Sequence, residues 1–161
     1  MKVCIIYHSE TGNTRHVAQH LSSAIVDSHL IEVFDRARYT FLTRYLVRCK
    51  KSRSEEKTDI EPSHLDVAGF DLIVFGSPVW AFKPTPVIHT AIDHLKGCEK
   101  ERVVAFVTHG GRPGQSEVVF RTWIEQRGMQ FCGFLGINQK EIEDDKVNAA
   151  LLAVVTAAGK K

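Results

Sequence analysis

Five short apolar runs alternate along the chain with segments whose apolar residues recur at helical spacing. The runs cover residues 2–7, 30–34, 71–76, 102–108 and 129–135. Strands that alternate with helices are typical of βαβ units, in which the strands form a parallel sheet. The third and fourth runs are apolar on both faces, which indicates central strands covered by helices on each side of the sheet.

The helical segments agree with this arrangement. One apolar stripe comprises Val87, Ile88, Ala91, Ile92 and Leu95, and another comprises Val147, Ala150, Leu151, Val154, Val155 and Ala158. With right-handed crossovers, the pattern predicts an α/β fold of three layers, with a doubly wound five-stranded parallel sheet in the order 2-1-3-4-5. A Rossmann dinucleotide fold is the alternative, but no G-x-G-x-x-G follows the first strand.

One segment departs from this regular alternation. Residues 36–57 contain eight lysines and arginines against few acids. The apolar residues of the segment that share one helical face are Phe41, Leu42, Tyr45, Leu46 and Cys49. We therefore predict a second helix with a basic outer face, followed by a polar loop that leads to the third strand. The basic face favours an acidic partner, and a solvated face with no partner explains it equally well.

Length, charge and cysteine content narrow the picture further. At 161 residues the chain has the size of one domain, and we expect a single domain over residues 1–161. A net charge of +2 is too small to indicate nucleic-acid binding. No apolar run approaches the roughly 18 residues of a membrane span, and no signal peptide precedes the first strand, so we expect a cytoplasmic protein. The four cysteines lack metal-binding spacing, so we expect reduced thiols and no metal site.

A polar turn follows the first predicted strand, at the sheet edge where open α/β folds bind their ligands. Its residues are Ser9, Glu10, Thr11, Gly12, Asn13 and Thr14. The turn has no lysine and is therefore not a P-loop. Its hydroxyls, the Asn13 amide and the backbone N–H groups of a helix N-terminus are sufficient to hold a phosphate dianion. Hydroxyls that only cap the helix are the alternative, but capping uses one or two such groups.

The same turn resembles the phosphate loop of the flavodoxin family, [ST]-x-[ST]-G-x-[ST]. The resemblance implies a flavodoxin-like fold and an FMN cofactor whose phosphate is wrapped by residues 9–14. The spacing of all five predicted strands also follows the family, so the resemblance covers nearly the whole chain.

A second loop, GSPVWAFKPTPVI, follows the third predicted strand and resembles a form common among flavodoxin-like proteins, G-[ST]-P-[VI]-[WY]. The resemblance implies that the isoalloxazine is bordered by Ser77, Pro78, Val79, Trp80 and Ala81, with Trp80 or Phe82 against a ring face. A broad π-system gains from such an apolar, aromatic wall. Ordinary packing is the alternative for Trp80.

A third loop, THGGRPGQS, follows the fourth predicted strand. Glycines let the backbone approach a flat ligand closely. The resemblance places the pyrimidine side of the flavin beside Thr108, His109, Gly110 and Gly111, and Gly114 belongs to the same loop. Many flavodoxins carry a second stacking aromatic here and this sequence has none, so one flavin face is expected to be open. Arg112 and His109 beside that face could steer a phosphate or donate a hydrogen bond, or be an ordinary loop charge and turn residue.

These features favour one function and leave two others open. The leading hypothesis is an FMN-binding electron carrier that passes electrons between redox proteins, with no catalytic residue of its own. The alternative is an FMN-dependent oxidoreductase in which NAD(P)H reduces the flavin and a quinone or similar acceptor oxidises it. A third is an interaction module that keeps the fold without flavin. No serine triad or paired carboxylates accompany the loops, and His16 and His20 on the first helix are expected to face solvent.

Overall fold

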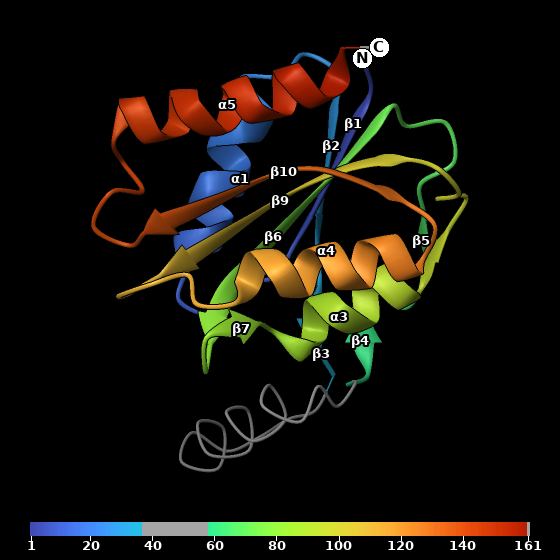
Figure 1. The fold of residues 1–161 in the computed structure, drawn as a ribbon, viewed down its shortest axis with the longest axis horizontal. Helices are drawn as coiled ribbons and strands as arrows, with labels where there is room; N and C mark the ends of the chain where they lie inside the picture. The colour runs from blue at the N-terminus through green and yellow to red at the C-terminus, as the bar shows by residue number, and fades with distance from the viewer. Residues whose placement is uncertain (37–57, 161) are drawn as a thin grey trace.

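The computed structural model describes residues 1–36 and 58–160, which form three layers around a central sheet (Figure 1). The five main strands are β1 (Val3–Tyr7), β2 (Ser28–Glu32), β6 (Leu72–Trp80), β9 (Arg102–His109) and β10 (Gln130–Asn138). They are parallel to one another and lie in the order β10-β9-β6-β1-β2. This order confirms the predicted 2-1-3-4-5 arrangement and the flavodoxin-like, doubly wound α/β fold.

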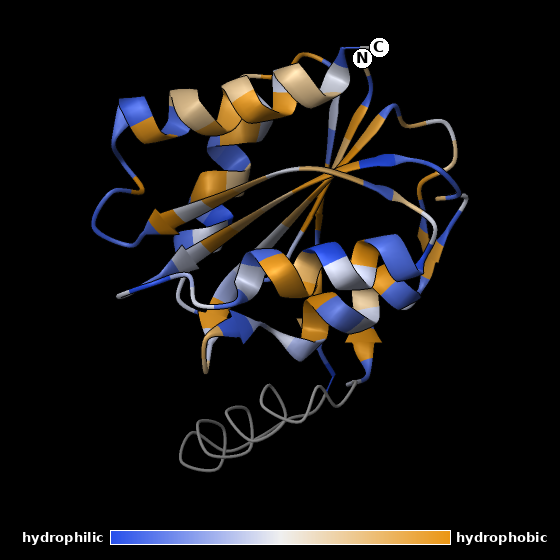
Figure 2. Cartoon of the chain, in the orientation of Figure 1, coloured by the Kyte–Doolittle hydropathy of each residue, from blue (hydrophilic) through white to orange (hydrophobic). Residues whose placement is uncertain are grey.

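Two helices cover each face of the sheet (Figure 1). They are α1 (Asn13–Ser23) and α5 (Asp145–Gly159) on one face, and α3 (Pro86–Asp93) and α4 (Ser116–Gln126) on the other. The remaining strands are short: β3 (Phe34–Asp35), β4 (Ile60–Glu61), β5 (Leu65–Asp66), β7 (Lys83–Pro84) and β8 (Leu95–Lys96). In Figure 2 the central strands are mostly apolar, whereas the helices alternate apolar and hydrophilic residues, as a one-sided contact with a sheet requires.

Strand β1 shows why both faces must be covered. Cys4 and Ile6 belong to the core beneath α3 and α4, whereas Val3, Ile5 and Tyr7 belong to the core beneath α1 and α5. All five side chains are buried, because successive residues of a strand point to opposite faces of the sheet. An uninterrupted apolar strand is therefore the sequence signature of this sandwiched position.

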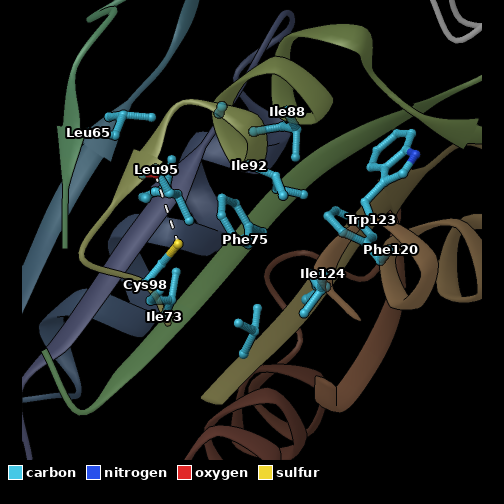
Figure 3. Packing of buried hydrophobic residues seen from close by; sticks show 14 of the residues in the cluster. Leu65, Ile73, Phe75, Ile88, Ile92, Leu95, Cys98, Phe120, Trp123 and Ile124 are labelled. Carbon is cyan, nitrogen blue, oxygen red and sulfur yellow. Dashed lines mark hydrogen bonds between the residues drawn. The ribbon is translucent and has the colours of Figure 1, made fainter. Parts of the chain in front are cut away.

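The core beneath α3 and α4 is shown in Figure 3. Phe75 of β6 and Phe120 and Ile124 of α4 are fully buried there, and each such side chain contributes about 1.5–3 kcal/mol by leaving water. The buried Cys98 thiol donates to the Leu95 carbonyl oxygen at 3.9 Å. Burial also raises the pKa of the Cys4 thiol to about 12, so this thiol stays protonated and unreactive.

Three predicted strands had wrong boundaries. The second strand spans Ser28–Glu32 and not residues 30–34, and the fifth spans Gln130–Asn138 and not residues 129–135. The third continues past residue 76 to Trp80, because β7 pairs antiparallel with its end and supplies hydrogen bonds there. The basic helix predicted over residues 36–57 lies outside the described residues except for Arg36. Among the helices that the structure describes, none has the length and apolar character needed to cross a bilayer.

Candidate functional site

Three loops meet at the edge of the sheet formed by the carboxyl ends of β1, β6 and β9. Thr14, at the start of α1, and Thr108, near the end of β9, are buried and their hydroxyl oxygens are 2.8 Å apart. The Gln115 N–H donates to the Phe82 carbonyl oxygen at 2.8 Å. These two hydrogen bonds tie the first loop to the third and the third to the second, so the three predicted loops lie together at one edge of the sheet.

The first loop turns into α1 at Gly12, whose φ of +95° lies in the left-handed region that favours glycine. The Ser9 hydroxyl accepts from the Arg15 N–H at 3.1 Å. Within the part of the chain that the structure describes, the N–H groups of Thr11, Gly12 and Asn13 have no acceptor. A helix N-terminus with open N–H groups and adjacent hydroxyls is a donor set that fits a phosphate.

The cation nearest to this loop in sequence, Arg15, is neutralised by a carboxylate. Arg15 donates from Nε and a terminal nitrogen to Glu32 at 3.0 and 2.6 Å, and the Tyr7 hydroxyl donates to the same carboxylate at 3.0 Å. The hydrogen bond and the charge of Glu32 raise the pKa of Arg15. Burial, as the larger cause, and the hydrogen bond to Glu32, as the smaller one, raise the pKa of Tyr7 to about 12. The sequence analysis missed this cluster. Its signal is the pairing of Tyr7 with Glu32 in the β1–β2 register, which requires the correct strand boundary.

Replacement of Thr14 by valine is expected to lower the free energy of unfolding by about 1–3 kcal/mol, because the buried Thr108 hydroxyl loses its partner. Urea denaturation of the variant and of Thr14→Ser, which keeps the hydroxyl, would measure the effect. Equal stability of Thr14→Val and the unsubstituted protein would contradict the assigned hydrogen bond.

The second loop is a hairpin between β6 and β7. Its two tip residues, Ala81 and Phe82, both have positive φ (46° and 67°), a conformation that two-residue hairpins normally assign to Asn-Gly. Ser77 is buried, accepts from the Thr85 N–H at 2.9 Å and donates to the Pro78 carbonyl oxygen at 2.9 Å. The Ser77 side chain therefore holds the hairpin together from within.

The aromatic side chains of this hairpin lie outside the core. Phe82 is 69% exposed at the tip. Trp80 is half-buried with Pro78 and Val79, and its ring meets the edge of the His8 ring at a centroid distance of 6.0 Å. Neither core cluster of the described residues includes Trp80, so the alternative of ordinary packing is left only as packing at the surface.

The third loop is exposed at Gly110, Gly111 and Gly114. Gly114 has a φ of +62°, and a Cβ added there would meet the carbonyl oxygen of Phe82 at 2.5 Å, so the loop lies directly against the hairpin tip. His109 is half-buried, and burial lowers its pKa while Glu141 opposes the shift. No aromatic residue occurs between His109 and Gln115, and Phe82 contacts this loop through its backbone and Cβ.

The remaining histidines of the first helix give no metal site. His16 and His20 are exposed on α1. Across residues 1–36 and 58–160, no three His, Cys, Asp or Glu side chains converge in a group that could hold a metal ion.

Comparisons with known proteins agree with this geometry. The family model of NADPH-dependent FMN reductases matches residues 1–130. The fold is similar to that of a flavoprotein from Lactobacillus acidophilus NCFM in complex with FMN (TM-score 0.70, 24% identity, covering 88% of this chain and 96% of the other). It is also similar to a Bacteroides uniformis flavoprotein (TM-score 0.77, 21% identity, covering 93% and 97%) and to two-electron reduced Megasphaera elsdenii flavodoxin (TM-score 0.63, 18% identity, covering 99% and 100%). No curated protein sequence matches the chain.

The family match covers most of the chain, and the structural likenesses extend over nearly all of it. They confirm the predicted flavodoxin-like fold and identify FMN as the flavin of this family, in agreement with the cofactor that the sequence predicts. The chain belongs to the family of NADPH-dependent FMN reductases, a flavodoxin-like family of flavoproteins.

Proposed function

We propose that the protein is an FMN-dependent oxidoreductase that uses NAD(P)H as its hydride donor and passes electrons to a quinone or a similar small acceptor. The observation that carries this proposal is the third loop, which is rich in exposed glycine and has no aromatic side chain between His109 and Gln115. A nicotinamide must stack on a flavin face, and such a loop leaves room for it. Membership in a family named for NADPH-dependent reduction supports the same reading.

The roles of the three loops follow from their donors and surfaces. Residues 9–14 hold the phosphate through backbone N–H groups and hydroxyls, since Arg15 is already paired with Glu32. The hairpin residues Ser77–Phe82 border the ring system, and the half-buried Trp80 supplies apolar surface next to it. Residues Thr108–Gly111 and Gly114 bring backbone close to the pyrimidine side without a Cβ in the way at the glycines.

Bound FMN supplies the chemistry of hydride acceptance and of electron release to the acceptor. The protein orients the two reactants. The pKa of His109 is lowered by burial, so its imidazole is neutral at physiological pH and adds no cation beside the ring. Arg112, exposed in the same loop, is available to attract the phosphates of a nicotinamide nucleotide.

The test is steady-state oxidation of NADPH and NADH by the FMN-loaded protein with a soluble quinone. We expect turnover that depends on bound FMN and on the acceptor. If the protein binds FMN, fails to oxidise either nucleotide, and accepts electrons from a separate reductase, it is an electron carrier. If the purified protein is colourless and does not quench the fluorescence of added FMN, both flavin functions are wrong and the interaction module stands.

The electron carrier remains the second candidate because one observation favours it. Phe82 is a large apolar side chain left 69% exposed at the hairpin tip, where the residue conformation is strained. An exposed aromatic residue beside a flavin edge is suited to contact a redox protein. Replacement of Phe82 by serine, measured on the FMN-saturated protein, would slow electron transfer from a protein partner if the protein is a carrier.

A further inference from the structure

Strand β10 forms one edge of the central sheet, and its outer side has no partner strand among the described residues. It lies between α4 and α5, which cover its two faces (Figure 1). Its nine residues include no charged residue and no proline. Proteins normally protect an edge strand with charges, proline or a covering segment, because open backbone groups can pair with another strand. The outer edge of β10 is therefore suited to pairing with another chain.

The apolar side chains of β10 are buried less completely than those of its neighbour β9. Residues 131–136 are all half-buried, whereas residues 103–107 of β9 are fully buried. Phe134 packs on the core beneath α3 and α4, and Leu135 packs on the core beneath α1 and α5. The exposed apolar area is therefore present on both faces of the strand, where a strand placed alongside would cover it.

The end of the strand shows which backbone groups point outward. Gln139 donates its N–H to the His109 carbonyl oxygen at 2.8 Å, so the backbone of Gln139 faces β9. The register with β9 is regular from Gly133 onward. Because successive residues of a strand direct their N–H and C=O groups to opposite sides, Phe134 and Gly136 direct theirs away from β9.

Two features limit the open edge to a short segment. The register with β9 shifts between Phe131 and Gly133, where a bulge bends the strand. At the other end, the Asn138 carbonyl oxygen accepts from the Glu141 N–H at 2.8 Å. The regular part of the edge with open backbone groups is therefore residues 133–137, Gly-Phe-Leu-Gly-Ile.

This segment is complementary to itself. When two copies run antiparallel about a twofold axis at Leu135, Phe134 lies opposite the partner's Gly136, and Gly133 lies opposite the partner's Ile137. Each of these large side chains thus meets a glycine on the same face of the sheet, where the missing side chain leaves space for it. The same register aligns the outward backbone groups of Phe134 with those of Gly136, as a hydrogen-bonded antiparallel pair requires. Because the pattern repeats on reversal, a second copy fits the edge better than an unrelated strand does.

We propose that the outer edge of β10 is a dimer interface, at which residues 133–137 pair antiparallel with the same segment of a second copy and join the two sheets into one. Phe134 and the partner's Gly136 exchange both of their backbone hydrogen bonds, and the twofold axis repeats the exchange. Each copy uses the same edge in this contact, so the assembly closes as a dimer and does not extend into a fibre. The inference goes beyond the proposed function and does not depend on bound FMN.

The interface borders the third loop. A Cβ built on Gly136 would lie 3.0 Å from the Cβ of Pro113, on the same loop as the exposed glycines. The loop itself is not part of the paired segment, so the second copy would lie beside the functional site and not within it.

Sedimentation velocity of the full chain, from micromolar to millimolar concentration, tests the association. We expect a reversible equilibrium between monomer and dimer. Phe134→Lys should weaken the association at least about tenfold, because a lysine replaces the aromatic contact with glycine at two symmetric places in each dimer. Val26→Lys is the matched control, since Val26 is fully exposed in the turn before β2, near the other edge of the sheet, and should leave the association unchanged. A chain that stays monomeric throughout, or equal association of both variants, would overturn the inference.

Amide hydrogen exchange gives a readout that needs no substitution, so the proposal is tested even if Phe134→Lys does not fold. Measured by NMR on the unsubstituted protein, the N–H groups of Phe134 and Gly136 should exchange more slowly as the protein concentration rises. The N–H of the exposed Val26 should exchange at the same rate at every concentration. A dimer that leaves exchange at Phe134 and Gly136 unchanged would use another surface and would contradict the proposal.

The register is tested by cross-linking. Opposite residues of a non-hydrogen-bonded antiparallel pair have Cα atoms about 4.5 Å apart, within the range that a disulfide spans. Leu135→Cys, combined with Cys132→Ser to remove the neighbouring thiol, should therefore link two chains under mild oxidation. Ser23→Cys in the same background, on the exposed side of α1, should not. Equal linking at both positions, or none at Leu135→Cys, would overturn the twofold pairing at Leu135.

Discussion

Gly114→Ala is expected to lower the free energy of unfolding by about 2–4 kcal/mol and to weaken FMN binding at least about tenfold. Two effects add at this position. The φ of +62° is strained for any residue with a Cβ, and the new methyl group would lie 2.5 Å from the carbonyl oxygen and 2.6 Å from the Cβ of Phe82. Backbone atoms cannot move aside as a flexible side-chain end can, so the third loop must separate from the hairpin tip.

Gly111→Ala is the matched control in the same loop. Gly111 is exposed, and a Cβ built on it meets nothing within 4 Å. Its replacement should therefore change the free energy of unfolding by less than about 0.5 kcal/mol. Urea denaturation of both variants would measure the contrast in stability, and FMN fluorescence titration of Gly114→Ala would measure the loss of affinity. Equal effects at the two glycines would show that the contact between loop and hairpin does not support the site.

The strand order was predictable because it depends on features that are local in sequence. The runs of β6 and β9 are apolar at consecutive positions, which identifies central strands covered on both faces. Handedness of crossovers then leaves few arrangements for five strands. The polar turn from Ser9 to Thr14 was equally local, since a strand, a glycine with positive φ and a helix follow one another within a few residues.

The hairpin shows what local patterns miss. Ala81 and Phe82 are not turn formers, yet both adopt positive φ because β6 and β7 pair around them. The sequence therefore predicted a loop from residue 77, whereas the strand continues to Trp80. Tertiary contact with the third loop, through the Phe82 carbonyl oxygen and Gly114, supports a conformation that the residues themselves disfavour.

Hydrogen bonds between residues far apart in sequence were also not predictable. The hydroxyls of Thr14 and Thr108 are hydrogen-bonded although 94 residues separate them, and His8 contacts the Val33 carbonyl oxygen across 25 residues. No motif encodes such partners, because they depend on the register of strands at the sheet edge. From the sequence, Thr14 was predicted as a phosphate ligand, but its hydrogen bond to the buried Thr108 was not predicted. His8 was not predicted to be a site residue. The residue types at the sheet edge were thus predictable, whereas their hydrogen-bond partners could be read only from the structure.

Thr11→Val is expected to weaken FMN binding about tenfold or more, because a hydroxyl that donates to a charged phosphate contributes about 1.5–3 kcal/mol. Thr11 is exposed and lies next to the open N–H groups of the loop, whereas the hydroxyl of Thr14 is bound to Thr108. The substitution should leave the free energy of unfolding within about 0.5 kcal/mol, as should Thr156→Val on the exposed side of α5. Fluorescence titration with FMN and with riboflavin provides the measurement, since riboflavin lacks the phosphate and should bind both proteins equally. Unchanged FMN affinity, or an equal loss of affinity for riboflavin, would remove the phosphate from the turn between β1 and α1.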